Sequence, residues 1–174
     1  MNPTDDPRLT AMGLLAEVHS GLTAKMNQVF AEAGLSEVDV ETLIRLSRSP
    51  ERRLRMSDLA AQTSLSTSGV TRVVDRLERD GLVERVACPS DRRASYATLT
   101  EGGLTRLDSV IPKHLEDIET WFTGLLSPGQ LKEFLNTLRL IRDVVRPCAT
   151  AGASEPGTVA ADVTATGRVR PVRS

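Results

Sequence analysis

The stretch that decides the fold is MSDLAAQTSLSTSGVTRVVDRLERDGLVERVACPSDRRASYATLTEGG, residues 56–103. Ser57 is the predicted N-cap of a short helix. The polar turn at residues 63–66 separates that helix from a second one over residues 67–80, which Gly81 is predicted to end. Two short helices joined by a tight turn are typical of a helix-turn-helix.

A hairpin is predicted directly after the second helix. Residues 82–86 and 95–99 are its two strands, and the loop between them is predicted to span residues 87–93. A helix-turn-helix followed by a hairpin makes a winged helix-turn-helix. The expected fold class is therefore mainly α with a small β-hairpin wing.

The second helix separates its residues into two faces. At about 100° per residue, its apolar side chains gather on one side: Val70, Val73, Val74 and Leu77. The opposite side carries Thr67, Ser68, Thr71, Arg72, Asp75, Arg76 and Arg79. Short hydroxyl side chains let a helix approach base edges, and arginine binds guanine or phosphate through two parallel hydrogen bonds. In isolation these arginines would indicate a solvated helix face, but beside a turn and a wing they favour DNA binding.

Long amphipathic segments flank this core. A helix over about residues 8–33 carries an apolar stripe at three- and four-residue spacings: Leu15, Val18, Leu22, Met26 and Val29. Further helix starts are predicted at Ser36, Thr100 and Ser127, and Pro112 is expected to kink the helix that runs from Thr100 to about Gly124.

The domain organisation follows from these segments. One domain is expected over residues 1–146, with a DNA-binding core at about 55–100 and dimerisation helices at about 8–33 and 127–146. The two end helices are assigned to dimerisation because a monomer would leave their apolar stripes exposed. Residues 147–174 lack periodicity and are predicted to be a disordered tail.

Charge is unevenly distributed along the 174 residues, although the net charge is only −1. Residues 1–44 carry two basic and seven acidic groups, whereas residues 45–106 carry twelve arginines and eight acidic groups. The basic excess therefore coincides with the predicted winged domain, where a local patch can bind phosphate.

Composition disfavours several other classes of protein. No apolar run reaches membrane-spanning length and no signal pattern opens the chain, so a cytoplasmic protein is expected. The two histidines and two cysteines lie far apart in sequence and show no metal-ligand spacing. Neither an enzyme nor a metal site nor a cofactor is expected.

The run from residue 56 to 103 resembles the MarR family of bacterial transcriptional regulators. The resemblance rests on VTRVVDRLERDGLVER at residues 70–85 and on DRRASYATLTEGG at residues 91–103, which includes an Asp-x-Arg wing signature at 91–93. It extends outward over about residues 8–146. It implies a homodimer that binds double-stranded DNA at a pseudo-palindromic operator, with the recognition helix in the major groove and the wing in the minor groove.

The resemblance also implies particular DNA-binding residues. The candidates are Ser66, Thr67, Ser68, Thr71, Arg72, Arg76, Arg85, Asp91, Arg92 and Arg93. In the wing, Asp91 would orient Arg93, and either Arg92 or Arg93 would enter the minor groove. Two alternatives stay open for Arg85: a contact with the DNA backbone, or an ion pair with Glu84 or Asp91.

A small aromatic or phenolic effector that releases a repressor from DNA is a further implication. Its candidate pocket residues are Met12, Leu15, His19, Leu46 and His114, and the alternative for both histidines is a polar contact at the dimer interface. Two other functions remain open: a non-catalytic winged-helix module that binds protein, and a cysteine-based redox-sensing regulator that uses Cys88.

Overall fold

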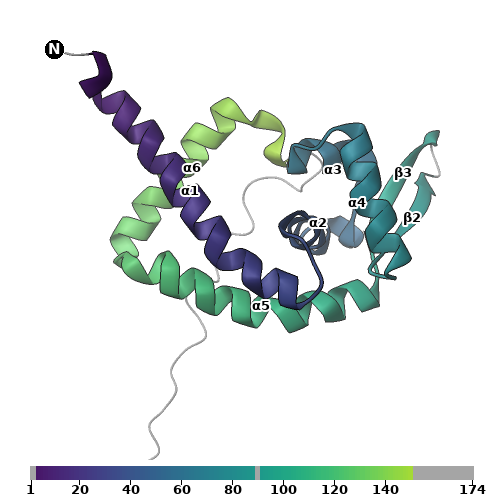
Figure 1. Cartoon of the computed structure of the whole chain (residues 1–174). Helices are drawn as coiled ribbons and strands as arrows, with labels where there is room; N and C mark the ends of the chain where they lie inside the picture. Colours follow the sequence, from purple (N-terminus) through teal and green to yellow (C-terminus); the bar gives the residue numbers. More distant parts are fainter. Residues whose placement is uncertain (1–2, 89–90, 151–174) are drawn as a thin grey trace, which may run out of the picture.

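The computed structural model describes residues 3–88 and 91–150 of the chain, and Figure 1 shows its arrangement. The helices are α1 (Pro7–Glu32), α2 (Glu37–Ser47), α3 (Met56–Thr63), α4 (Thr67–Arg79), α5 (Glu101–Trp121) and α6 (Pro128–Val145). The strands are β1 (Arg53–Arg55), β2 (Val83–Cys88) and β3 (Asp91–Leu99), and short 3-10 helices include η2 (Pro50–Arg52), η3 (Thr123–Leu125) and η4 (Pro147–Thr150). The predicted fold class, mainly α with a small wing, is confirmed.

Most helix starts follow the predicted capping chemistry. The Ser36 side chain accepts a hydrogen bond from the Asp39 amide while Asp39 accepts one from the Ser36 amide, and Ser127 forms the same reciprocal arrangement with Gln130. The start of α3 was predicted wrongly. Its cap position is Arg55, which makes no side-chain cap, so Ser57 lies inside the helix.

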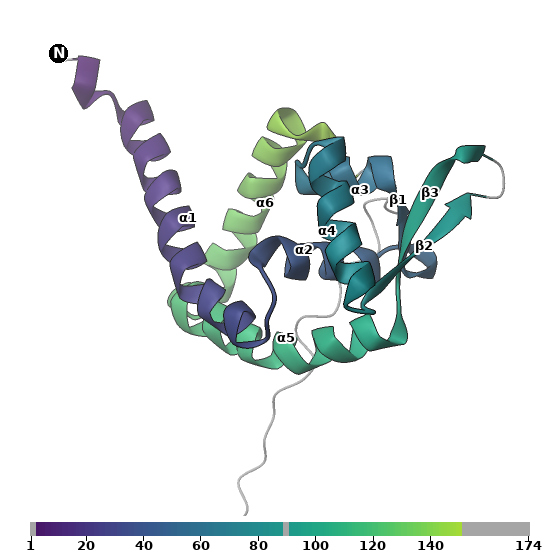
Figure 2. The same cartoon turned by 45° about the vertical axis from the view of Figure 1, so that its right-hand side comes forward.

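The sheet has three strands in the order β1-β3-β2, and all neighbours are antiparallel. β1 was missed because three residues are too short to show alternation; its Leu54 is buried and pairs with Ala97 of β3. The hairpin strands are also longer than predicted, since β2 reaches Cys88 and β3 starts at Asp91. Figure 2 shows this hairpin projecting from the body of the molecule as the wing.

The core lies where α2, α3 and α4 meet the sheet. Its fully buried side chains include Leu43, Leu46, Leu59, Val70, Val74 and Leu77. The apolar face predicted for residues 67–80 is confirmed, because all four of its members are buried. Burial of this face fixes which side of α4 points outward.

The outer helices bury little of their apolar surface. Only Val29 and Phe30 of α1 are buried, and α6 has no buried residue. The N-terminal half of α1 extends beyond the rest of the chain in both views (Figures 1 and 2). Large exposed apolar side chains on these two helices include Leu9, Met12, Leu15, Val18, Leu140, Ile141, Val144 and Val145.

Two further predictions need correction. The helix after Thr100 ends at Trp121, three residues before Gly124, although Pro112 lies inside it as predicted. The predicted tail starts too early, because Pro147–Thr150 form η4 and Ala149 is buried. Residues 151–174 of the predicted tail lie outside the described residues. No helix within residues 3–88 and 91–150 is both long and apolar enough to cross a membrane.

Candidate nucleic-acid interface

The N-terminus of α4 presents hydroxyl groups at the surface. Ser66 caps the helix, and its Oγ accepts a hydrogen bond from the Gly69 amide at 3.1 Å. Thr67 and Ser68 are exposed, and Ser68 Oγ lies 3.1 Å from Ser66 Oγ. Thr71 Oγ1 donates to the Thr67 carbonyl at 2.8 Å. This end of the helix combines small side chains with backbone N–H groups and the positive end of the helix dipole, which together favour an anion.

The three arginines of α4 differ in what they contact. Arg76 donates to Asp39 through Nε at 3.2 Å and forms an ion pair with it through Nη2. Arg79 lies 3.4 Å from Asp80. Arg72 is exposed and has no hydrogen bond or ion pair within the part of the chain that the structure describes. Arg72 is therefore the arginine of this helix whose charge is available to an external anion.

Arg76 has a structural role that the sequence pattern did not reveal. Asp39 is 3% exposed and its second oxygen accepts hydrogen bonds from the amide and hydroxyl of Ser36. The guanidinium of Arg76 supplies the positive charge that a buried carboxylate requires. We therefore assign Arg76 to the joint between α2 and α4 rather than to the DNA-facing set.

Arg85 joins the wing to the recognition helix. It pairs with Asp75 and lies 3.9 Å from Glu78, and its Nη2 donates to the Thr71 carbonyl at 3.2 Å. Glu84, one partner considered from the sequence, makes no ion pair with it among the described residues, and the side chain of Asp91, the other, lies outside them. The alternation of β2 explains the difference, because Arg85 pairs with buried Ala97 and so lies on the sheet face that α4 covers.

The tip of the wing is only partly described. Asp91, Arg92 and Arg93 form the start of β3, and their side chains lie outside the described residues, so their proposed roles stay predictions.

The base of the wing carries two arginines outside the predicted DNA-binding set. The guanidinium carbons of Arg53 and Arg55 lie 4.9 and 5.9 Å from the centre of the Tyr96 ring. A hydrogen bond with Tyr96 is the main cause that raises the pKa of Arg55. Cys88 is 3% exposed beside them, with Sγ 3.9 Å from the Tyr96 hydroxyl. The short strand β1 explains why sequence periodicity missed this cluster.

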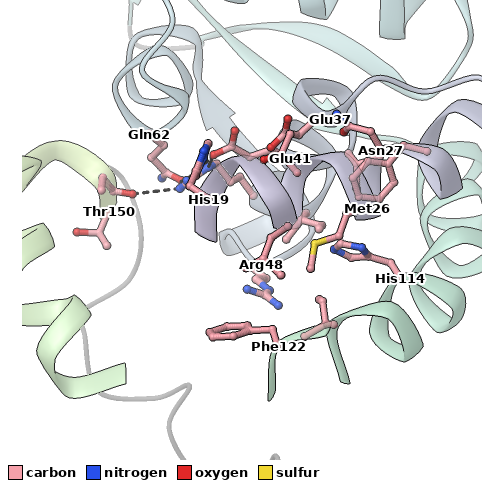
Figure 3. Close-up of a pocket in the computed structure, with 18 of the residues that line it drawn as sticks. His19, Met26, Asn27, Glu37, Glu41, Arg48, Gln62, His114, Phe122 and Thr150 are labelled. Carbon is pink, nitrogen blue, oxygen red and sulfur yellow. Dashed lines mark hydrogen bonds and ion pairs between the residues drawn. The ribbon is translucent and has the colours of Figure 1, made fainter. Parts of the chain in front are cut away.

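A cavity of about 730 Å³ lies between α1, α2 and α5, with Gln62 of α3 and Ala149 and Thr150 of η4 also in its lining (Figure 3). Both predicted histidines, His19 and His114, line it. The other three candidates do not: Leu46 is fully buried in the core, while Met12 and Leu15 are exposed on the outer part of α1. Other lining residues were not predicted from the sequence, among them Glu41 and Arg45 of α2 and Arg48 at its C-cap.

His114 is a partly buried polar group of the cavity. Its ring centroid lies 4.7 Å from that of Phe30, and its Nδ1 is buried without a hydrogen-bond partner among the described residues. Burial lowers the pKa of His114, and the Asp117 carboxylate opposes this effect. A neutral imidazole that faces a cavity can donate one hydrogen bond to a small molecule or accept one from it.

Known proteins share this architecture. The model of the MarR family matches residues 33–94. AbsC, a MarR family transcriptional regulator from Streptomyces coelicolor, is 37% identical, with a TM-score of 0.75 over 82% of this chain and 96% of AbsC. Sco3205 from the same organism, a MarR family regulator solved in complex with DNA, is 30% identical, with a TM-score of 0.75 over 80% of this chain and 91% of Sco3205.

A further relative is a transcriptional repressor. The HTH-type transcriptional repressor YetL from Bacillus subtilis is 34% identical over 101 residues, which are 56% of this chain and 60% of YetL. The alignment therefore spans less than two thirds of that repressor. The similarity to AbsC covers nearly all of a solved family member, together with the winged helix-turn-helix described above. The chain belongs to the MarR family of transcriptional regulators.

Proposed function

We propose that this chain is a ligand-responsive transcriptional repressor that binds a pseudo-palindromic operator as a homodimer. In this proposal α4 enters the major groove and the wing enters the adjacent minor groove. The observation that carries it is the outward face of α4, where Arg72 is exposed without a partner among the described residues. Arg72 follows Thr71 directly and lies about one turn from Thr67 and Ser68. The DNA complex of Sco3205 and the repressor activity of YetL support this assignment.

The homodimer is supported by the outer helices. α1 and α6 leave most of their large apolar side chains exposed, and Val144 of α6 is 81% exposed. A surface of this kind marks a protein contact. Two copies joined by these helices would present two α4 helices to half-sites about one helical turn of DNA apart.

Wing residues complete the proposed contact. Arg92 and Arg93 start β3 next to the wing tip, where an arginine can enter a narrow minor groove, and Asp91 would orient Arg93. Arg85 is left out of this set because its guanidinium is already paired with α4.

The effector is proposed to occupy the cavity between α1, α2 and α5. The apolar lining from Phe30 and Phe122, with His19 and His114 beside it, supports an aromatic or phenolic molecule. Binding there would bias the position of the neighbouring helix-turn-helix, and so release DNA.

The proposal is tested by binding to fragments selected from the source genome, measured by fluorescence anisotropy across a salt series. Each phosphate that the protein neutralises releases counterions, so about six phosphate contacts give a log–log salt slope near −5. A steep negative slope with selected fragments and a weaker affinity for scrambled DNA are expected. Binding that does not depend on salt, or no binding at low salt, would contradict the proposal and favour a winged-helix module that binds protein.

A further inference from the structure

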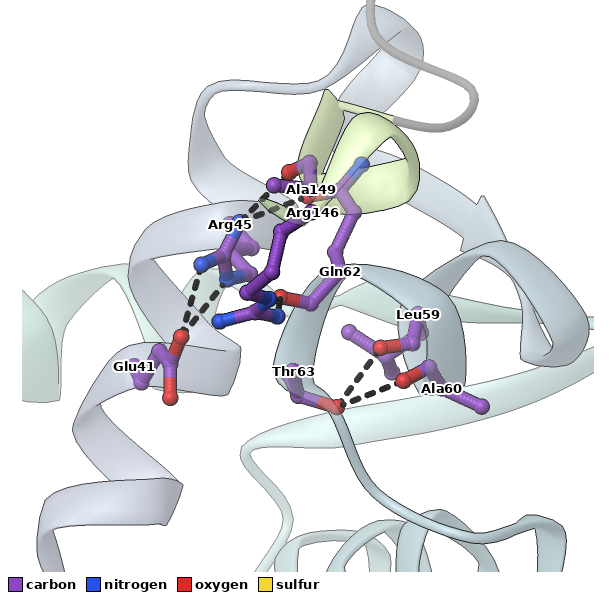
Figure 4. A network of polar contacts seen from close by, with 8 residues as sticks. All are labelled: Glu41, Arg45, Leu59, Ala60, Gln62, Thr63, Arg146 and Ala149. Carbon is purple, nitrogen blue, oxygen red and sulfur yellow. Dashed lines mark hydrogen bonds and ion pairs between the residues drawn. The ribbon is translucent and has the colours of Figure 1, made fainter. Parts of the chain in front are cut away.

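The chain continues beyond α6 and turns back onto the helix-turn-helix. We name residues 146–150, the C-cap of α6 together with η4, the C-terminal strap. η4 packs against α3, and Ala149 is 8% exposed although Cys148 and Thr150 on either side are exposed. The strap therefore links a proposed dimerisation helix to the first helix of the helix-turn-helix (Figure 4).

Two hydrogen bonds connect the strap with α2 and α3, and a third joins α2 to α3 beside it. Arg146 Nη2 donates to the backbone carbonyl of Gln62 in α3 at 2.8 Å. Arg45 Nη1, from α2, donates to the Ala149 carbonyl at 3.1 Å and to Gln62 Oε1 at 3.2 Å. Arg45 Nη2 is held in turn by Glu41 at 2.7 Å. Gln62 is 4% exposed, so water competes weakly for these bonds. Arg45 is the point at which α2, α3 and the strap meet.

The same residues form one wall of the cavity. Arg45, Gln62, Ala149 and Thr150 all line it. Figure 3 shows Gln62 and Thr150 at this wall. A ligand at this wall therefore contacts the strap and both of its partners. A ligand acceptor that takes the place of the Ala149 carbonyl on Arg45 removes one of the bonds that hold the strap, and an acceptor with negative charge binds the guanidinium more strongly than a carbonyl does.

We propose that the C-terminal strap is a regulatory element that positions the helix-turn-helix for DNA and is released by a ligand at this cavity wall. The proposal rests on DNA binding by α4, as proposed above. When the strap is hydrogen-bonded to α2 and α3, it holds α3 against α2. Because α3 and α4 pack against each other, a change in the position of α3 is passed to α4. Release of the strap then lowers operator affinity without any contact between the ligand and DNA.

The first test uses a matched pair of arginines on α6 and the strap in the full-length protein. Arg146→Gln removes the donor to the Gln62 carbonyl, whereas Arg142→Gln removes a guanidinium that pairs with Asp143 at the surface. Hydrogen exchange is measured across α3 and α6, together with operator affinity. Arg146→Gln should speed exchange in α3 and weaken operator binding about fivefold to tenfold, which corresponds to the net contribution of one typical hydrogen bond, and Arg142→Gln should do neither.

The second test places a phenol inside the strap. Ala149→Tyr puts a bulky ring at the buried position that faces the cavity, and Cys148→Tyr places the same ring at the exposed neighbour. Ala149→Tyr should displace the strap from α3, speed hydrogen exchange in α3 and weaken operator binding. Cys148→Tyr should leave the exchange rate and the operator affinity near the wild-type values. Circular dichroism melting of each variant confirms that the fold is retained.

The outcomes separate this proposal from the proposed function. Exchange in α3 that stays at the wild-type rate in Arg146→Gln and Ala149→Tyr would overturn the strap and leave the repressor assignment intact. Faster exchange with unchanged operator affinity would overturn its regulatory role. Wild-type protein that binds no selected fragment at low salt would instead contradict the proposed function.

Discussion

Arg76 of the recognition helix forms an ion pair with Asp39, a carboxylate that is 3% exposed and that also caps α2. The pair links α2 to α4, and its two residues lie 37 positions apart in the sequence. It explains why an arginine on the outward side of α4 is half-buried instead of extended into solvent. The neighbouring Arg72, one turn earlier, lacks such a partner among the described residues, so two arginines of one helix face have different roles.

Arg76→Ala should therefore reduce stability. Removing the guanidinium leaves a buried carboxylate without its counter-charge, and because Arg76 itself is partly exposed the expected loss is about 2 kcal/mol in the free energy of unfolding. Urea denaturation measures it. Arg79→Ala is the matched control, since Arg79 is 73% exposed and its pair with Asp80 should contribute less than about 1 kcal/mol. Equal losses in both variants would contradict the structural role of Arg76.

Arg72→Ala should weaken operator binding with little change in stability. If Arg72 binds a phosphate, affinity falls uniformly across sequences and the salt slope decreases by about one; if it reads a base, specificity at that position relaxes by about 1–3 kcal/mol. Anisotropy titrations against the operator and its single-base variants distinguish the two. Arg139→Ala, on α6, should leave affinity unchanged. Wild-type binding by Arg72→Ala would mean that the DNA-facing surface lies elsewhere.

Val144→Asp should dissociate the proposed dimer. Val144 is 81% exposed in one chain, so a charge there costs little in the monomer but would be buried without a partner in a dimer joined through α6. Light scattering after size exclusion should show a fall from the mass of two chains to one, with loss of operator affinity. Lys132→Asp, at an exposed polar position of the same helix, should remain dimeric. A wild-type protein that is already monomeric would refute the assembly.

Stability should depend on pH through His114. Burial lowers the pKa of His114 in the folded state, so the unfolded chain binds the proton more readily. The neutral form therefore stabilises the fold fully above the unfolded pKa of about 6.5, and stability is lost as the pH falls from there through the folded value. His114→Gln should reduce this loss between pH 7.5 and 5.5, and Asp117→Asn should enlarge it because Asp117 opposes the shift. Identical urea midpoint shifts in all three proteins would argue against this role for His114.

Cys88 should resist modification in the native protein. It is buried against Tyr96, whereas Cys148 is exposed, so a thiol reagent should label Cys148 first and Cys88 only on unfolding. Mild peroxide should consequently leave operator binding unchanged in wild type and in Cys88→Ser alike. Loss of binding in wild type, with retention in Cys88→Ser, would establish the cysteine-based switch considered from the sequence.

Local patterns in the sequence were sufficient to predict the winged helix-turn-helix. The apolar spacing of Val70, Val73, Val74 and Leu77 predicted the buried face of α4, and capping residues such as Ser36 and Ser127 predicted where helices begin. These features depend on neighbours within one or two helical turns. The candidate interface followed from the same periodicity, because burial of one face leaves the other outside.

The tertiary structure alone decided which of the outward charges are available. Arg76 forms an ion pair with Asp39, and Arg85 forms one with Asp75. Neither partner could be predicted from the periodicity of the sequence, because each pair joins two different elements. The same holds for β1, which pairs with β3 across more than forty residues, and for the strap, whose Ala149 meets Arg45 across 104 positions. Periodicity reports which face of an element is buried. Which charges meet depends on how the elements pack, and only the folded chain brings those side chains within hydrogen-bond distance.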